Sequence, residues 1–159
     1  MLFSASISTP IGPMLIEAND AFITKIIFSD QPIESNPSRL TDLAALQLHE
    51  YFAKRRAEFD LPLAAVGSGF QQHIMRLVAA IPFGKTITYS ELTSSYGDDK
   101  AIRAVASANG KNQYAIVIPC HRVLGKNGNL TGYAWGLQKK EWLLMHENAL
   151  PETLFSTNN

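Results

Sequence analysis

The chain has 159 residues and a formal net charge of zero, and its 46% hydrophobic and 18% charged residues indicate a folded protein of one or two units, not a disordered one. A single cysteine excludes an internal disulfide and a multi-thiolate zinc site, and the four histidines show no metal-ligand spacing, so we expect neither a metal nor a cofactor. No apolar run is long enough to cross a bilayer and the opening residues lack a basic signal region, so we expect a soluble cytoplasmic protein with no membrane partner.

The first third of the chain is typical of a small sheet followed by a helix. Alternating and β-branched residues predict three strands, over residues 2–8, 14–16 and 22–28. Apolar residues then recur at helical spacing from Leu40 to Phe52 and predict a helix that ends near Lys54-Arg55-Arg56. A further strand is expected over residues 59–63. The small-residue stretch 64–69 resembles a linker, so we expect an N-terminal α/β domain over residues 1–67.

The rest of the chain is predicted to be mostly helical, as a second domain over residues 68–150 with a tail over 151–159. Helices are expected over three ranges, residues 70–81, 90–96 and 100–108. Ser68 can cap the first helix, and Thr88-x-x-Glu91 has the form of a capping box for the second. The second and third helices, joined by a turn that contains glycine, have the helix-turn-helix pattern, which also fits an ordinary packed helix pair.

The charge distribution and the third of these helices leave a role in nucleic-acid binding open. Residues 61–147 hold nine Lys/Arg and five Asp/Glu, whereas residues 1–60 hold five and eight. This modest basic excess suits a polyanion. The third helix is rich in alanine, with Arg103 as its one large cation. Small side chains permit close approach to a nucleic-acid groove, but they also suit a helix that is simply buried.

The candidate nucleophile is Cys120, which follows the apolar run 116–118 and Pro119. We expect that run to be a buried strand or the floor of a core. A lone cysteine in a small protein is most often a buried, inert thiol. Here, however, His121 and Arg122 follow directly, and neighbouring cations favour the reactive thiolate. Adjacent residues of an extended segment point to opposite faces, so a hydrogen bond between Cys120 and His121 requires a turn or a bridging water.

Two further segments complete the candidate site. A helix is expected over residues 138–147, and Glu147 in its last turn opposes the helix dipole, which suggests a tertiary partner such as His121. Between the cysteine and this helix, residues 125–136 form a glycine-rich loop that carries Tyr133 and Trp135. Aromatic planes in such a loop can stack on a base, although they are also common as lids over a core.

The motifs of the second half together resemble the O6-alkylguanine-DNA alkyltransferases, also called methylated-DNA–protein-cysteine methyltransferases. The resemblance covers roughly residues 68–150 and rests on four motifs, Phe83-Gly84-Lys85-Thr86-Ile87-Thr88-Tyr89, Arg103-Ala104-Val105, Ile118-Pro119-Cys120-His121-Arg122-Val123 and Lys140-Glu141-Trp142-Leu143-Leu144 with His146-Glu147. It implies an α+β fold, with a ribonuclease-H-like antiparallel sheet and helix followed by a winged-helix-like domain that contains the helix-turn-helix.

The resemblance implies stoichiometric repair, in which Cys120 takes the methyl or other alkyl group of O6-alkylguanine, and also of O4-alkylthymine, and inactivates the protein. His121 would act as base through a water, with Glu147 orienting it. Asn112 would brace the turn, and Tyr89 would hydrogen-bond the departing guanine. Because a thioether is not readily hydrolysed, each molecule would react once.

The implied partner is double-stranded DNA, bound by a monomer through the minor groove, with Arg103 filling the space left by the flipped nucleotide. The other residues expected to contact DNA are Thr88, Tyr89, Ala101, Ala104, Ser107 and Arg122. The expected substrate pocket comprises Val123, Tyr133, Ala134 and Trp135, with the bulk of Trp135 narrowing it.

Two other functions are compatible with parts of the pattern. A Cys-His hydrolase or acyltransferase would form a thioester at Cys120 and turn over repeatedly. A non-catalytic reader of alkylated DNA would need no nucleophile, and the presence of Cys120 argues against it.

Overall fold

A computed structural model describes residues 1–150, which fold into two compact units. The first unit comprises Met1–Val66 and Gln113–Val117, and the second comprises Gly67–Asn112 and the chain from Ile118 onward. None of the helices in the described part of the chain has the length and apolarity required to span a membrane. The expected tail over residues 151–159 lies outside the described residues.

The first unit is built on an antiparallel sheet in the order β1-β2-β3, formed by β1 (Phe3–Ile7), β2 (Met14–Ala18) and β3 (Ile23–Phe28). Alternate residues of the central strand, Met14, Ile16 and Ala18, are completely buried. This alternation is what a strand shows when one face of its sheet covers a core. The three predicted strands are therefore confirmed.

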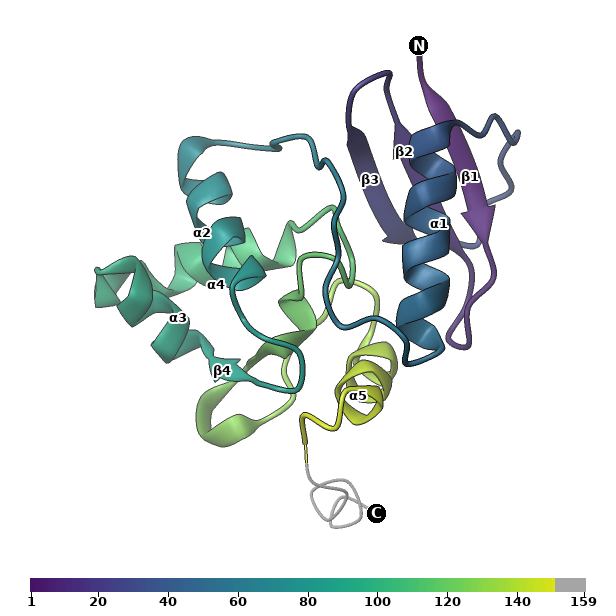
Figure 1. The fold of residues 1–159 in the computed structure, drawn as a ribbon. Helices are drawn as coiled ribbons and strands as arrows, with labels where there is room; N and C mark the ends of the chain where they lie inside the picture. The colour runs from purple at the N-terminus through teal and green to yellow at the C-terminus, as the bar shows by residue number, and fades with distance from the viewer. Residues whose placement is uncertain (151–159) are drawn as a thin grey trace. The chain divides into compact units, whose positions relative to one another are not determined.

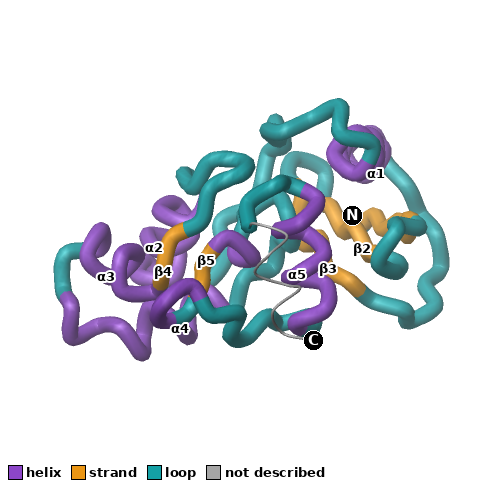
Figure 2. Tube along the Cα trace, turned by 90° about the horizontal axis from the view of Figure 1, so that it is seen from below, coloured by secondary structure: helices purple, strands orange, loops and turns teal. Residues whose placement is uncertain are grey.

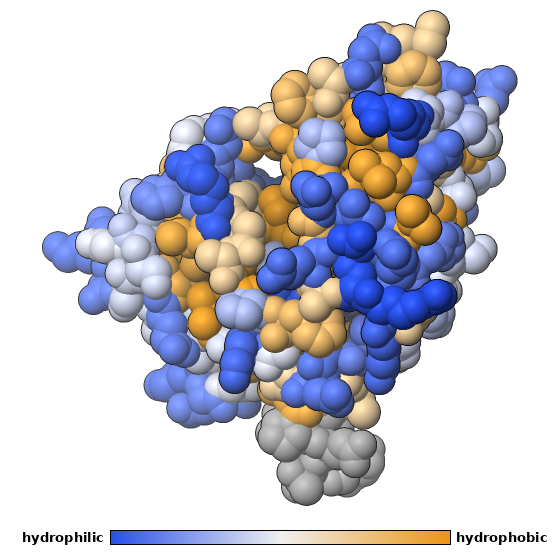
Figure 3. Space-filling model, viewed as in Figure 1, coloured by the Kyte–Doolittle hydropathy of each residue, from blue (hydrophilic) through white to orange (hydrophobic). Residues whose placement is uncertain are grey.

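Helix α1 (Arg39–Phe52) covers one face of this sheet, as Figure 1 shows. It begins with a capping box, in which the Ser38 hydroxyl accepts from the Thr41 backbone N–H and the Thr41 hydroxyl accepts from the Ser38 backbone N–H. Its buried residues include Ala44, Leu48 and Tyr51, all completely inaccessible. In Figure 3 the surface over α1 mixes hydrophilic and apolar residues and shows no single apolar patch.

Residues 59–63 do not form the expected strand. Instead Gln47 of α1 binds this segment at Asp60, accepting from its N–H at 2.9 Å and donating to its carbonyl at 3.0 Å. Only Leu63 makes a bridge, a parallel one to Ile23. The segment is thus held by the side-chain amide of Gln47 and by the backbone of Ile23, whose N–H donates to Pro62 O at 2.7 Å. A pattern of apolar residues does not reveal the side-chain contact.

The segment Gln113–Val117 belongs to the first unit, although it was predicted to lie in the second domain. It bonds to β3 through Ile26, whose N–H donates to Gln113 O at 2.9 Å and whose carbonyl accepts from the Ala115 N–H at 2.8 Å. Residues 116–118 do not form a strand, but Ile116 and Ile118 are buried, as expected if the run is the floor of a core. Ile116 has a φ of 72° and the Val117 N–H donates to Ala115 O, so the backbone turns here.

The second unit contains three helices that pack together, α2 (Gly69–Ala79), α3 (Tyr89–Tyr96) and α4 (Ile102–Gly110), the last preceded by the 3₁₀ turn η1 (Asp99–Ala101). The predicted caps are present, because the Ser68 hydroxyl accepts from Gln71 N–H and Thr88 and Glu91 form a capping box. Helix α3 ends at Gly97, whose φ of 102° lies in the left-handed region that favours glycine. The helix pair α3–α4 is the predicted helix-turn-helix.

The remaining elements of this unit include the turn that contains the cysteine. They are β4 (Ile87–Thr88), the 3₁₀ turn η2 (Cys120–Arg122), β5 (Val123–Leu124), the 3₁₀ turn η3 (Lys126–Gly128) and α5 (Leu137–His146). Strands β4 and β5 pair in parallel, which brings the start of α3 beside the chain that leaves the cysteine (Figure 2). The predicted α+β fold is confirmed.

Tyr114 should be the main polar anchor of segment Gln113–Val117. Its hydroxyl donates to Ala64 O at 2.6 Å and lies 3.1 Å from Ile23 O, and burial raises the pKa of the phenol to about 12. Tyr114→Phe should lower the free energy of unfolding by about 1–2 kcal/mol, because a buried carbonyl loses its donor. Urea denaturation measures the change. Tyr96→Phe, whose ring packs against Phe70 and His73, is the control, and an equal loss in both variants would contradict the prediction.

Candidate active site

Cys120 begins the 3₁₀ turn Cys120–Arg122 and is 3% exposed. The turn is closed by two hydrogen bonds, from Arg122 N–H to Pro119 O at 2.9 Å and from Val123 N–H to Cys120 O. The segment therefore forms a turn, which is one of the two arrangements that a contact between Cys120 and His121 was expected to require. The physical reason is that Pro119, with φ −81° and ψ 62°, turns the chain at the exit from the apolar run.

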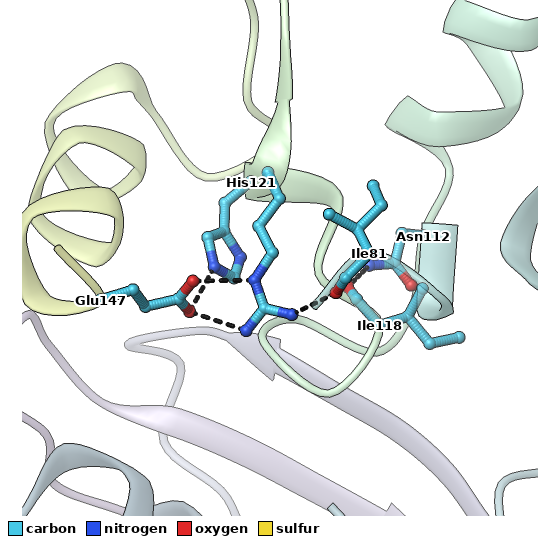
Figure 4. A network of polar contacts seen from close by, with 6 residues as sticks. Ile81, Asn112, Ile118, His121 and Glu147 are labelled. Atoms are coloured by element: carbon cyan, nitrogen blue, oxygen red, sulfur yellow. Dashed lines mark hydrogen bonds and ion pairs between the residues drawn. The ribbon is translucent and has the colours of Figure 1, made fainter. Parts of the chain in front are cut away.

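A buried polar network follows directly from this turn (Figure 4). The carboxylate of Glu147 lies 2.8 Å from His121 Nε2, and its two oxygens accept from Arg122 Nε at 2.7 Å and from Arg122 Nη2 at 3.0 Å. The side chains of His121 and Glu147 are completely inaccessible. The contact predicted between Glu147 and His121 is thus present, and Arg122 is an additional partner that sequence reasoning did not assign.

Arg122 does not fit its expected role as a DNA contact. Its side chain is 6% exposed, and its third nitrogen, Nη1, donates to Ile81 O at 2.7 Å. The guanidinium also lies over the ring of Phe83, 5.7 Å from its centroid. A guanidinium committed to an interior carboxylate is not presented to a phosphate, so Arg122 belongs to the network of Glu147.

The network sets the charges of its members. Burial lowers the pKa of His121, and the hydrogen bond that its ring donates to Glu147 only partly opposes this, so the imidazole is neutral near pH 7. Burial acts to raise the pKa of Glu147, but His121 and the Arg122 guanidinium together hold it well below its usual range. A neutral imidazole that donates from Nε2 to a carboxylate has Nδ1 as an acceptor. Within the described residues, Nδ1 is buried and has no hydrogen-bond partner.

The thiol of Cys120 is protonated in the resting protein. Burial raises the pKa of Cys120 to about 11, while a hydrogen bond from the Asn112 side chain and the charge of Lys140 oppose the rise. The expectation that His121 and Arg122 favour a thiolate is therefore wrong, because one is neutral and the other is paired with Glu147. Asn112 also donates from Nδ2 to Ile118 O at 2.8 Å and so holds the chain just before the turn.

Lys140 is a site residue that sequence reasoning missed. It is completely buried, and its ammonium donates to the carbonyls of Val123, Thr131 and Gly132 at 2.7, 2.8 and 3.1 Å. Burial lowers its pKa to about 8, and the charge of Cys120 opposes this shift. The available signal was its register in α5, because Lys140 shares the buried face with Leu143, Leu144 and Glu147 at helical spacing.

The expected pocket residues lie at or near the backbone carbonyls that Lys140 binds. Val123 is completely buried, Ala134 is exposed, and the rings of Tyr133 and Trp135 contact each other edge to face at 5.2 Å. The hydroxyl of Tyr133 is buried and has no hydrogen-bond partner among residues 1–150. Burial raises the pKa of Tyr133 well above its ordinary value, and the charge of Cys120 adds to this rise.

The residues expected to contact DNA lie on the helix-turn-helix. Tyr89 is the first residue of α3 after its cap Thr88, and both are partly exposed. On α4, Arg103, Ala104 and Ser107 are exposed, whereas Val105 and Ala108 face the core. Ala101, in the turn before α4, is partly exposed. The alanine-rich helix therefore has both properties that its composition left open, a buried face and an accessible face of small residues around one arginine.

No group of three or more His, Cys, Asp and Glu side chains within residues 1–150 is arranged to hold a metal ion.

Comparison with known proteins identifies the family. Residues 2–65 match the ribonuclease-like domain of 6-O-methylguanine DNA methyltransferase, and residues 69–149 match the DNA binding domain of the same family. The chain belongs to the 6-O-methylguanine DNA methyltransferase family. Its relatives include the methylated-DNA–protein-cysteine methyltransferases of Methanosarcina barkeri, 42% identical with 91% of this chain and 96% of that protein covered, and of Shigella flexneri, 36% identical with 94% and 97% covered.

Solved structures of the family have the same fold. The crystal structure of O6-methylguanine methyltransferase from Mycobacterium tuberculosis matches with a TM-score of 0.83 at 37% identity, covering 98% of this chain and 99% of that one. A structure of the Mycobacterium tuberculosis protein in complex with DNA matches with a TM-score of 0.83 at 37% identity, covering 94% and 95%.

The buried, neutral His121 makes the stability of the protein depend on pH. Because its pKa in the folded state lies below the ordinary 6.5, its contribution is fully present above that pH and is lost as the pH falls below it. Glu147 acts in the same direction, but at lower pH, below the ordinary carboxyl pKa of 4.5. The free energy of unfolding should therefore fall between about pH 7.5 and about pH 5.5, and should fall less in His121→Gln. Urea titrations at both pH values measure this, and an equal fall in the two proteins would refute it.

Proposed function

We propose that the protein repairs alkylated DNA by transferring a methyl group from O6 of guanine to Sγ of Cys120, once per molecule. The observation that carries the proposal is the buried network in which Glu147 binds both His121 and Arg122. These two residues directly follow the single cysteine in the sequence. Membership of the methyltransferase family supports the substrate class. The polar network supports the choice of nucleophile and base.

Activation of the thiol is assigned to His121. A thiol with a raised pKa needs a base, and a neutral imidazole with Nδ1 as acceptor is one. The proton of Cys120 passes to Nδ1 through a water molecule as sulfur approaches the methyl carbon. Glu147 stabilises the imidazolium that forms, and Arg122 keeps Glu147 ionised and in position. Asn112 and Lys140 stabilise the developing thiolate, since both favour the charged form of Cys120.

Departure of guanine is assigned to Tyr89. Sulfur forms a bond to the methyl carbon as the bond from that carbon to O6 breaks, and the electron pair stays with the base. Tyr89 donates its hydroxyl proton to the departing base. Imidazolium and phenolate then exchange protons through solvent, so the net change is one methyl group from oxygen to sulfur and one proton from sulfur to guanine. The thioether product is not readily hydrolysed, which makes the protein a single-use reagent.

DNA binding is assigned to the exposed face of α4. The small side chains of Ala104 and Ser107 allow the helix to approach the backbone closely, and we place this helix in the minor groove. Arg103 enters the base stack and fills the space that the flipped nucleotide leaves. Thr88, Tyr89 and Ala101 border the same surface. One protein acts on one lesion as a monomer, because nucleophile, base and DNA-contacting helix all come from one unit of one chain.

The base is recognised by the loop that follows the cysteine. Val123, Tyr133, Ala134 and Trp135 form its pocket, and the indole of Trp135 limits the size of the alkyl group. O4-methylthymine carries its methyl group on an exocyclic oxygen in the same way, and we include it as a second substrate.

The two alternative functions are less well supported. A Cys-His hydrolase requires a thioester and repeated turnover, and a non-catalytic reader requires no thiol. Neither explains why a base is held beside a buried thiol in a protein whose relatives are methyltransferases.

Incubation with a duplex that carries one O6-methylguanine should add a single methyl group to Cys120. Intact mass and peptide mapping measure the product, and the reaction should stop at one methyl group per protein. Cys120→Ser should give no methylated protein, because a serine hydroxyl is a much weaker nucleophile than a thiolate. Turnover beyond one equivalent would favour a hydrolase, and a methyl group on another residue would exclude Cys120.

Arg103→Ala should slow repair in duplex DNA by at least about tenfold, since extrusion of a base costs a few kcal/mol that the inserted side chain offsets. Reaction with free O6-methylguanine should change little, because no base has to be extruded. Single-turnover methylation rates measure both reactions. Arg76→Ala, which removes an exposed arginine from α2, is the matched control. Equal slowing on duplex and free base would argue against insertion of Arg103.

A further inference from the structure

Asn109 of α4 contacts the proposed proton donor. Its side-chain amide donates from Nδ2 to Tyr89 Oη at 3.3 Å, and the residue is 4% exposed. The contact joins the last turn of α4 to the first residue of α3. Asn109 was not among the residues that the sequence predicted for the site, and it contacts neither Cys120 nor His121 in the hydrogen bonds of the described residues.

The direction of this hydrogen bond determines what Tyr89 can do. A phenol has one proton to donate and can also accept. Because the amide N–H of Asn109 donates, Tyr89 uses an acceptor position for Asn109 and keeps its own proton for another partner. The electrostatics agree with this arrangement. Burial and the charge of Cys120 raise the pKa of Tyr89, and the Asn109 hydrogen bond opposes the rise, so it favours loss of the tyrosine proton.

The other end of the same amide is not satisfied. Asn109 Oδ1 is buried and has no hydrogen-bond partner within residues 1–150. A buried polar atom without a partner costs stability, and an apolar side chain of similar size would avoid that cost. The interface of α4 also has another polar contact, since Gln71 of α2 donates to Ala108 O at 2.9 Å. Helix packing alone therefore does not account for an asparagine at position 109. Its one hydrogen-bonded side-chain atom, Nδ2, binds Tyr89.

We propose that Asn109 is a positioning residue for methyl transfer, which holds Tyr89 as a hydrogen-bond donor to the departing guanine. This inference rests on the proposed function. As the carbon–oxygen bond breaks and the Tyr89 proton moves to the base, negative charge develops on Tyr89 Oη. The Asn109 N–H stabilises that charge and prevents the hydroxyl from rotating toward the interior. Asn109 thus acts through Tyr89 and not on the substrate.

The first test compares Asn109→Leu with the wild type in two measurements with an O6-methylguanine duplex and in one measurement of the protein's thermal stability. The single-turnover methylation rate should fall by about tenfold, the effect of about one hydrogen bond. The dissociation constant for the duplex should stay within about twofold, because Asn109 is buried and contacts no DNA. Thermal stability should be unchanged or higher, since an unsatisfied polar atom is removed. A merely structural asparagine would give the opposite pattern, with lower stability and an unchanged rate, and that result would overturn the proposal.

A double-mutant cycle with Tyr89→Phe separates positioning from every other effect. Asn109→Leu should slow the wild type but should have almost no effect in the Tyr89→Phe background, where there is no proton to direct. Asn109→Asp, which can only accept at neutral pH, should slow the Tyr89 protein more than the Tyr89→Phe protein, because it captures the tyrosine proton. Equal effects in both backgrounds, or a wild-type rate for Asn109→Asp, would overturn the proposal.

Two controls make a failure of the inference distinguishable from a failure of the proposed function. Gln71→Leu removes the neighbouring side-chain amide and should leave the rate within about twofold of wild type. Methylation of Cys120 in the wild-type protein tests the proposed function by itself. If Cys120 is methylated and the Asn109 variants react as the wild type does, only the role of Asn109 fails. If Cys120 is not methylated, the function fails and the inference fails with it.

Discussion

The carboxylate of Glu147 is the constraint on which the site depends. It is completely buried, and an unpaired charge there would be costly. His121 and Arg122, which are adjacent in the chain, both bind it, so their two side chains converge on one group. That convergence requires the backbone to turn at Cys120, because neighbours on an extended strand would point apart. The conformation of the nucleophile's own segment is thus set by a residue 27 positions further along the sequence.

The same network explains why the thiol needs a base. Arg122 is paired with Glu147, and burial keeps His121 neutral, so neither residue of this turn supplies a cation that stabilises a thiolate. The thiol is therefore protonated at rest, with its pKa raised by burial to about 11. Such a cysteine is protected from adventitious reaction and must be deprotonated where the substrate is bound. A protein that is consumed by one reaction benefits from a nucleophile that is inactive until then.

Helix α5 connects the network to the glycine-rich loop of residues 125–136. Lys140 and Glu147 lie seven residues apart on the buried side of this helix. They bind the two segments that make up the site. Glu147 holds the 3₁₀ turn through side chains, whereas Lys140 holds Val123 and the chain before Tyr133 through backbone carbonyls. A loop with four glycines would be flexible in isolation. Here a single buried ammonium gives it a defined path, so the expected pocket residues are carried on an anchored segment.

Local patterns of residues determined much of this protein. The alternation in β2, the helical period of α1, the caps at Ser68 and Thr88 and the unfavourable position of Glu147 each depend on near neighbours, and the structure has all of them. Motif content also determined the family, because several motifs in order are specific where one cysteine is not. Neighbouring residues, however, could not indicate that the run 116–118 turns or that Gln47 holds residues 59–63.

Only the tertiary structure decided the charges of the site and its indirect partners. In the sequence, Arg122 lies close to the cysteine and resembles an activating or DNA-binding cation. In the structure it is paired with the carboxylate of Glu147, at the C-terminal end of α5. Lys140 resembles a surface lysine, and Asn109 an ordinary residue at the end of a helix. Their roles depend on burial and on partners brought together from different elements, and desolvation is a property of the folded interior. Which residues react thus stays a prediction from the sequence, while the fold determined their protonation and their orientation.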